Sequence, residues 1–440
     1  MRKSRLLACA ALAAFMPFCL APLSTAYAQT QPSVVREAPP APQAFDFDRG
    51  RNVSVTDRPR PDYDPPGVRL GGIFFHPGLV AEAGTDSNVF YSSANERDDI
   101  VYALKPQIEV KTDWSRHGIV AAIGLDDYRY QDSDSENHTD VYARGEGRLD
   151  VRRGSYILLG GSQGRLTERR GAPDSPLAAA KPLRYESREA HIVGVQEFNR
   201  ARVSLRLDRE NLNYRDVALI GGGFADQDQR DHTTTTGTAR LEYGVSPDTA
   251  LVAQISANMR DYRLHPPRSQ FDRDSMGTSY LVGINTDLTK LVRGELIVGY
   301  LQQDYDDPAL KTAKGLALEA NIQYFPTPLT TVTLKAKRQV EETLTGTASS
   351  YVATYTQARI DHELRRNVLL TAGIGATNRD FQGASRTDDV MEANAGARFL
   401  LNRRMELGAR WQYEKQNSSG PIADPDYDVN RFVVSASVRF

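Results

Sequence analysis

Four short acidic clusters are the parts of this sequence whose residue types could bind a metal ion. Carboxylates held close together are calcium ligands, but an EF-hand loop also needs a glycine and a terminal glutamate at set positions, which these clusters lack. We therefore expect solvated turns and predict no metal site. The clusters are residues 132–136, 271–275, 304–308 and 424–428.

The seven histidines do not form a recognisable catalytic or metal-binding motif. They are scattered along the chain without an HExxH arrangement or another ligand spacing. A serine hydrolase would need a pair such as Ser279 and His232 on neighbouring strands, and the sequence gives no such register. The glycine runs at 160–164 and 221–224 lack the Lys-Ser/Thr pair and the helix of a phosphate-binding loop. We predict no catalytic residue, no cofactor and no enzymatic activity.

Charged residues instead recur at every second position, which is the periodicity of a β-strand. Arg144, Glu146 and Arg148 alternate with glycine and leucine, and the last nine residues alternate apolar with polar side chains up to Phe440. Segments of this kind follow one another from residue 73 to the end, and no stretch has a helical period. We count about eighteen strands, with sixteen possible. Their centres lie near residues 78, 105, 124, 146, 160, 192, 207, 239, 256, 283, 299, 319, 335, 357, 372, 395, 409 and 435.

The N-terminus has the three parts of a secretory signal peptide. A basic start is followed by an apolar run and by an Ala-x-Ala site at Ala26 and Ala28, so residues 1–28 are predicted to be cleaved. Both cysteines lie in this segment, so the mature chain can form no disulfide. Cleavage removes three basic residues and leaves 51 basic against 56 acidic ones. This net negative charge excludes nucleic acid as a partner.

Residues 29–70 form a second region, which is rich in proline and charge and poor in periodic apolar residues. We interpret it as a largely disordered periplasmic tail. The alternatives are that it folds back into the remainder of the chain or docks on a partner. Residues 71–440 then form the third region, the strands.

The strand pattern predicts an all-β fold, a transmembrane antiparallel up-and-down β-barrel in the cell outer membrane. Hydrocarbon offers no hydrogen-bond partner, so a spanning sheet must close on itself. Its strands face lipid with every second side chain, which agrees with the polar mean hydropathy of −0.48. Short turns alternate with longer loops, and the short set is predicted to be periplasmic. Outer-membrane lipids and lipopolysaccharide are then the surroundings, and divalent ions bridging acidic loops to lipopolysaccharide are an alternative to plain turns.

The alternation also sorts side chains between lumen and lipid. Nine charged residues are the predicted lumen-facing set: Arg144, Glu146, Arg148, Arg206, Asp208, Arg260, Lys335, Lys337 and Arg398. Aromatic residues near strand ends are predicted to form two girdles, Trp114, Tyr243, Tyr324, Phe399 and Phe440 on the periplasmic side and Tyr300, Trp411, Tyr413 and Phe432 on the outer side.

Residues 58–90, RPRPDYDPPGVRLGGIFFHPGLVAEAGTDSNVF, resemble the first segment of the putative beta-barrel porin 2 family. The shared features are the Pro-Asp-Tyr-Asp run, the Gly-Val-Arg-Leu-Gly run, Pro-Gly-Leu, and the run that ends in Asn88-Val89-Phe90. The chain departs from the family pattern at Asp62, Thr85 and Ser87. The resemblance implies an outer-membrane barrel without catalytic residues, and a role in exporting exopolysaccharide or capsule together with a periplasmic export protein.

Three functions remain open at this point. The resemblance favours a passive conduit for secreted polysaccharide. The alternatives are a general or small-solute diffusion porin and a non-conducting structural or adhesive barrel. A terminal aromatic strand ending in Phe440 also resembles the signal that the outer-membrane barrel assembly machinery reads, so Phe440 is the predicted assembly signal.

Overall fold

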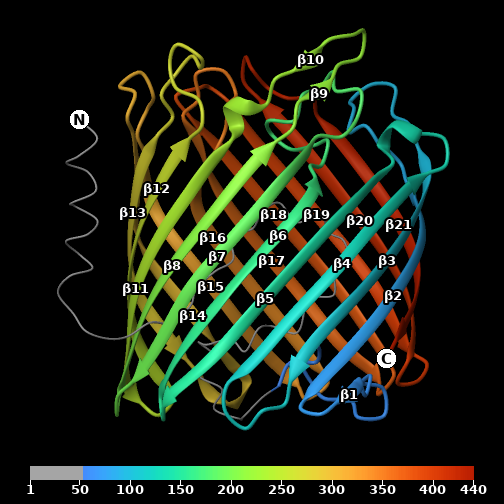
Figure 1. The fold of residues 1–440 in the computed structure, drawn as a ribbon, viewed down its shortest axis with the longest axis vertical. Helices are drawn as coiled ribbons and strands as arrows, with labels where there is room; N and C mark the ends of the chain where they lie inside the picture. Colours follow the sequence, from blue (N-terminus) through green and yellow to red (C-terminus); the bar gives the residue numbers. More distant parts are fainter. Residues whose placement is uncertain (1–52) are drawn as a thin grey trace.

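The computed structural model describes residues 53–440, so the predicted signal peptide and most of the predicted tail lie outside the described residues. One antiparallel sheet of 19 strands contains nearly all the secondary structure of this range (Figure 1). Strand β1 pairs only with the start of β2, and the other eighteen strands close into a barrel because β21 pairs with β2. The prediction of an eighteen-stranded antiparallel barrel is therefore confirmed. No helix in the described part of the chain is long and apolar enough to cross a membrane.

The strands of the barrel wall are β2 (Ile73–Asp86), β3 (Asp99–Thr112), β4 (Gly118–Tyr130), β5 (His138–Arg152), β6 (Ser155–Thr167), β7 (Arg184–Glu197), β8 (Ala201–Tyr214), β11 (His232–Ser246), β12 (Thr249–Tyr262), β13 (Ser275–Thr286), β14 (Val292–Tyr305), β15 (Ala313–Thr327), β16 (Thr330–Glu342), β17 (Ser350–Arg365), β18 (Val368–Gln382), β19 (Thr387–Leu400), β20 (Met405–Ser419) and β21 (Tyr427–Arg439). The remaining elements are β1 (Val68–Leu70), the hairpin β9 (Val217–Ala218) and β10 (Phe224–Ala225), and the 3-10 turns η1 (Asp134–Glu136), η2 (Asp228–Arg230) and η3 (Thr289–Leu291).

Side-chain alternation separates the two faces of the wall. In β21, Phe432, Val434 and Val438 are exposed, as is Phe440 just after the strand, whereas Arg439 is only 5% exposed. An eighteen-stranded barrel in a bilayer presents such an apolar set to lipid and its polar set to the lumen. Eight of the nine predicted girdle residues are exposed on the outer face, and Tyr413 is half-buried.

The connections differ in length between the two rims of the barrel. The turns predicted to be short join strands at one rim, for example residues 153–154 between β5 and β6 and residues 366–367 between β17 and β18. The long connections lie at the other rim, together with the β9–β10 hairpin (Figure 1). By the rule for outer-membrane barrels, the long set is extracellular and both ends of the barrel are periplasmic.

Candidate functional site: the lumen and its constriction

The loop between β6 and β7, residues 168–183, is the feature that narrows the barrel, and we call it the crossing loop. Its base is closed by the amide of Glu168, which donates to the carbonyl of Leu183 at 2.7 Å. Its partners lie far around the ring. Six strands on one side and eight on the other separate it from the β16–β17 connection, residues 343–349, which it contacts. The loop therefore extends from its own wall into the lumen, where it meets the β16–β17 connection.

An ion pair ties the start of the crossing loop to strand β20. Arg169 Nη1 lies 2.7 Å from Glu414 Oε2, and both side chains are largely buried. The hydroxyl of Tyr427 donates to the other carboxylate oxygen of Glu414 at 2.8 Å. Burial would lower the pKa of Arg169, but the surrounding acidic groups, Glu414 first among them, together hold this pKa above its ordinary value. Arg169 therefore stays charged at physiological pH.

A second anchor joins the middle of the crossing loop to the β16–β17 connection. One carboxylate oxygen of Asp174 accepts from the hydroxyl of Thr343 at 2.7 Å, from the amide of Leu344 at 3.0 Å and from the hydroxyl of Thr345 at 3.1 Å. A carboxylate that accepts several such bonds is held in one geometry. The two connections therefore form a continuous bridge over the lumen.

Neighbouring loops hold the crossing loop from the sides. The guanidinium of Arg170 donates to Glu136 at 2.8 and 2.5 Å, and that of Arg230 donates to Glu168 at 3.0 and 2.5 Å. A small apolar core under the loop contains Ala179, Leu183 and Val217, with Tyr214 and Ala225 packed against it. The constriction is thus built from ion pairs at its ends and apolar packing at its base.

Below the constriction the lumen wall carries charges of both signs, most of them paired. The carboxylate of Glu82 on β2 lies 2.9 Å from Lys105 Nζ and 3.0 Å from Arg410 Nη1. Lys105 is on β3 and Arg410 is on β20, the strands that flank the β2–β21 pair. Arg240 donates to Glu242 on its own strand and to Glu295 on β14, both at 2.8 Å. Because β11 and β14 are not neighbours, the Arg240–Glu295 contact must run across the concave, lumenal side.

The predicted lumen-facing residues all lie on this same face of their strands, opposite the exposed apolar set. Their pairing differs. Arg148 bonds Asp150, Arg206 bonds Asp208, Glu146 bonds His191, Arg398 bonds Glu406 and Arg260 bonds Glu342. Within residues 53–440, no ion-pair partner approaches Arg144, Lys335 or Lys337. Their role in conduction stays a prediction.

Sequence reasoning missed the residues of the constriction, namely Arg169, Asp174, Glu414 and Tyr427. The length of the 168–183 connection marked it as a loop, but nothing in its composition shows whether it points outward or across the lumen. The hypothetical Ser279 and His232 pair is not brought together. His232 pairs with Tyr262 and Ser279 with Ser256, so they are separated by six residues along β12, or about 20 Å at the rise of a strand.

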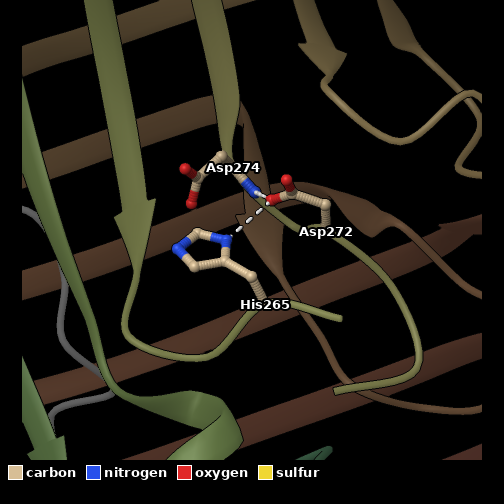
Figure 2. Close-up of side chains that lie close together, drawn as sticks. All are labelled: His265, Asp272 and Asp274. Atoms are coloured by element: carbon tan, nitrogen blue, oxygen red, sulfur yellow. Dashed lines mark hydrogen bonds and ion pairs between the residues drawn. The ribbon is translucent and has the colours of Figure 1, made fainter. Parts of the chain in front are cut away.

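Carboxylates of the predicted acidic clusters contribute to loop geometry. His265, Asp272 and Asp274 lie in the β12–β13 loop with one potential ligand atom each within 4.8 Å of the others (Figure 2). The imidazole of His265 contacts Asp272 at 3.1 Å, and Asp272 also accepts from the amide of Asp274 at 3.2 Å. In the fourth cluster, Asp424 pairs with Arg386 of the next loop. Hydrogen bonds within the protein thus already use these carboxylates.

At the periplasmic rim, residues 53–66 of the predicted tail fold back against the barrel instead of extending away from it. The amide of Val55 donates to Thr331 Oγ1 at 3.0 Å, and the guanidinium of Arg60 lies 2.9 Å from Glu363 on the lumenal face of β17. Arg58 donates to the same carboxylate at 3.0 Å, and Glu363 is only 3% exposed. This segment therefore narrows the periplasmic mouth.

Replacing Arg60 with alanine is expected to detach residues 53–66. Removing one partner of a buried ion pair costs about 3 kcal/mol, which corresponds to roughly 100-fold faster exchange of the Val55 amide. Hydrogen–deuterium exchange of this segment measures the effect. Arg69→Ala is the control, because Arg69 pairs with Asp113 at the same rim but both side chains are exposed. Equal exchange in the two variants would contradict a buried anchor.

The comparison with protein families agrees with this architecture. The model of the putative beta-barrel porin 2 family matches residues 60–440. No curated protein matches the chain. The similar solved structures include three proteins of Pseudomonas aeruginosa. OccK1 (OpdK) is 12% identical, with a TM-score of 0.43, and the match covers 83% of this chain and 99% of that chain. OpdO is 15% identical, with a TM-score of 0.44, and the match covers 83% of this chain and 97% of that chain. OccK2 (OpdF) is 10% identical, with a TM-score of 0.45, and the match covers 83% of this chain and 98% of that chain. The match over residues 60–440 shows that the chain belongs to the putative beta-barrel porin 2 family.

Proposed function

We propose that this protein is a passive diffusion porin of the outer membrane for small polar solutes. The observation that carries the proposal is the bridge over the lumen, formed by Arg169 with Glu414 and by Asp174 with Thr343. A barrel of eighteen strands is wide enough for an aqueous channel, and a loop anchored on β20 and on the β16–β17 connection divides that width into narrower passages. The proposal assigns no catalysis to any residue.

The bridge favours small solutes over the polysaccharide that the sequence resemblance suggests. A growing polymer needs a continuous wide path, and the crossing loop is held at its start by a buried ion pair and at its middle by several hydrogen bonds. Ion pairs along the lumen wall offer polar groups to water and to small solutes, and neither positive nor negative charge is in strong excess there. Displacing the bridge for a polymer would break several of these contacts together.

Liposome swelling tests the proposal directly. Purified protein reconstituted in liposomes should admit a pentose or hexose and largely exclude a trisaccharide, and it should give steady ion conductance in planar bilayers. Heat-denatured protein is the control for leakage. Absence of both swelling and conductance would favour a non-conducting barrel, whereas equal passage of hexose and long dextran would favour a polymer conduit.

A further inference from the structure

Strands β15 and β16 separate in the extracellular half of the wall. Their pairing ends at Leu318 and Arg338, although β15 begins at Ala313 and β16 continues to Glu342. On their other sides both strands remain paired, β15 with β14 up to Ala313 and β16 with β17 up to Glu342. We call the unpaired stretches, residues 313–317 and 339–342, the seam. An open edge inside a bilayer is costly, so the seam needs an explanation.

Along the seam, the end of β16 lies inside the barrel. Val340, whose position in the alternation faces outward, packs against Val252, Leu281, Ile297, Leu301 and Ala317 of the lumen wall. Val352, its partner on β17, is only 2% exposed although its place in the alternation is also on the outer face. The upper β16–β17 hairpin has therefore curled into the lumen.

Specific contacts hold the hairpin in this position. Arg260 of β12 forms an ion pair with Glu342 and donates to the carbonyl of Val340, and the hydroxyl of Tyr262 donates to Glu342 at 2.7 Å. From above, Arg273 donates to the carbonyls of Thr343 and Ala348 at 2.8 and 3.0 Å. The separation of β15 from β16 is thus stabilised by partners on β12 and on the β12–β13 loop.

A cavity of about 180 Å³ lies between the curled strand and the lumen wall. It is amphipathic: Leu281, Leu301 and Val340 line one part. Arg260, Lys337 and Arg338 supply cationic groups to the other part, which also contains one carboxylate, that of Glu319. Next to it, a side chain on the lumen-facing Gly315 of the seam would meet no atom within 4 Å. The lumen side of the seam is therefore open, while Leu316, one residue on, is exposed on the outer face.

We propose that the seam is a lateral passage between the lumen and the outer leaflet for small carboxylates with an apolar tail. The tail lies against the apolar cluster, and the carboxylate lies near Lys337. The ammonium of Lys337 forms no ion pair with Glu319, its cross-strand neighbour, although both line the cavity. This path is distinct from the aqueous one proposed above, so either can fail without the other.

Tryptophan quenching tests the passage. The two natural tryptophans, Trp114 and Trp411, are replaced by phenylalanine, and single reporters are introduced as Gly315→Trp at the seam, Leu316→Trp facing lipid and Gly118→Trp in the lumen near the periplasmic end. Gly118 is the matched control, because its added side chain would meet only Thr112, at 3.9 Å. Vesicles contain either 8-bromooctanoate or a phospholipid brominated on its acyl chain.

We expect both probes to quench Gly315→Trp and Leu316→Trp, and neither to quench Gly118→Trp. Lys337→Met should weaken quenching of Gly315→Trp by 8-bromooctanoate about tenfold and leave quenching by 8-bromooctanol unchanged. The proposal would be overturned if Gly315→Trp were quenched no more strongly than Gly118→Trp. The lateral opening would be overturned if 8-bromooctanoate quenched Gly315→Trp and the brominated phospholipid did not. Should the tryptophan variant not assemble, a spin label on Gly315→Cys gives the same decision. The measurement compares how often the label collides with oxygen and how often it collides with an aqueous nickel complex.

Discussion

Replacing residues 171–180 of the crossing loop with Gly-Gly-Ser is expected to raise single-channel conductance at least about twofold. The replaced segment includes Asp174 and therefore the whole anchor to Thr343 and Thr345. The closing hydrogen bond from Glu168 to Leu183 lies outside it, so the ends of β6 and β7 keep their spacing. Because wall strands are not altered, the barrel should assemble and differ only in the width of its lumen. Planar bilayer recordings at one salt concentration measure this.

The control for that variant is a deletion in an extracellular loop that does not cross the lumen. Residues 93–96 are exposed and lie between β2 and β3, so their removal should leave the conductance unchanged. The single substitution Asp174→Ala should give a smaller increase, since Arg169 still pairs with Glu414. An unchanged conductance in the loop-replacement variant, with normal assembly, would mean that the crossing loop does not limit the passage.

The sequence allowed the barrel to be predicted because each strand carries its own signal. Alternation in β21, for instance, is complete within thirteen residues and needs no knowledge of its partners. The lumen assignment follows from the same local rule, which is why Arg144, Arg206 and Arg398 all lie on the face opposite the exposed apolar side chains. Strand count and side-chain face are thus properties of short segments.

The constriction could not be predicted because its contacts join distant parts of the chain. Arg169 and Glu414 are 245 positions apart, and neither belongs to a recognisable motif. The seam leaves only an ambiguous trace in the sequence. The alternation of β16 is interrupted by the polar run Lys337-Arg338-Gln339 and again at Glu341-Glu342. Such a run is equally compatible with a strand that rises out of the membrane, so it does not say that β16 leaves its neighbour. Such features depend on which side chains meet across the lumen.

Deleting Phe440 is expected to reduce the amount of assembled protein far more than it changes the conductance of the molecules that do assemble. In the folded barrel, Phe440 contributes an amide hydrogen bond to the carbonyl of Pro77 at 3.0 Å and a ring 5.3 Å from the guanidinium of Arg404. Together these contacts are worth about 1–2 kcal/mol. The nine residue pairs that join β2 to β21 all precede Phe440, so the barrel remains closed without it.

A loss of about 1–2 kcal/mol would change abundance only severalfold, so a much larger fall requires a role before folding is complete. Phe399→Ala provides the matched control, because Phe399 is also 41% exposed and lies in the same predicted girdle. We expect Phe399→Ala to assemble at near-normal levels, Phe440→Ala to fail as the deletion does, and Phe440→Trp to restore assembly. Heat-modifiable migration of outer-membrane fractions in gels measures all four variants. Equal losses for Phe399→Ala and Phe440→Ala would show that the terminal ring acts only as one lipid-facing aromatic among several, and recognition by the assembly machinery would then have to rest on another part of β21.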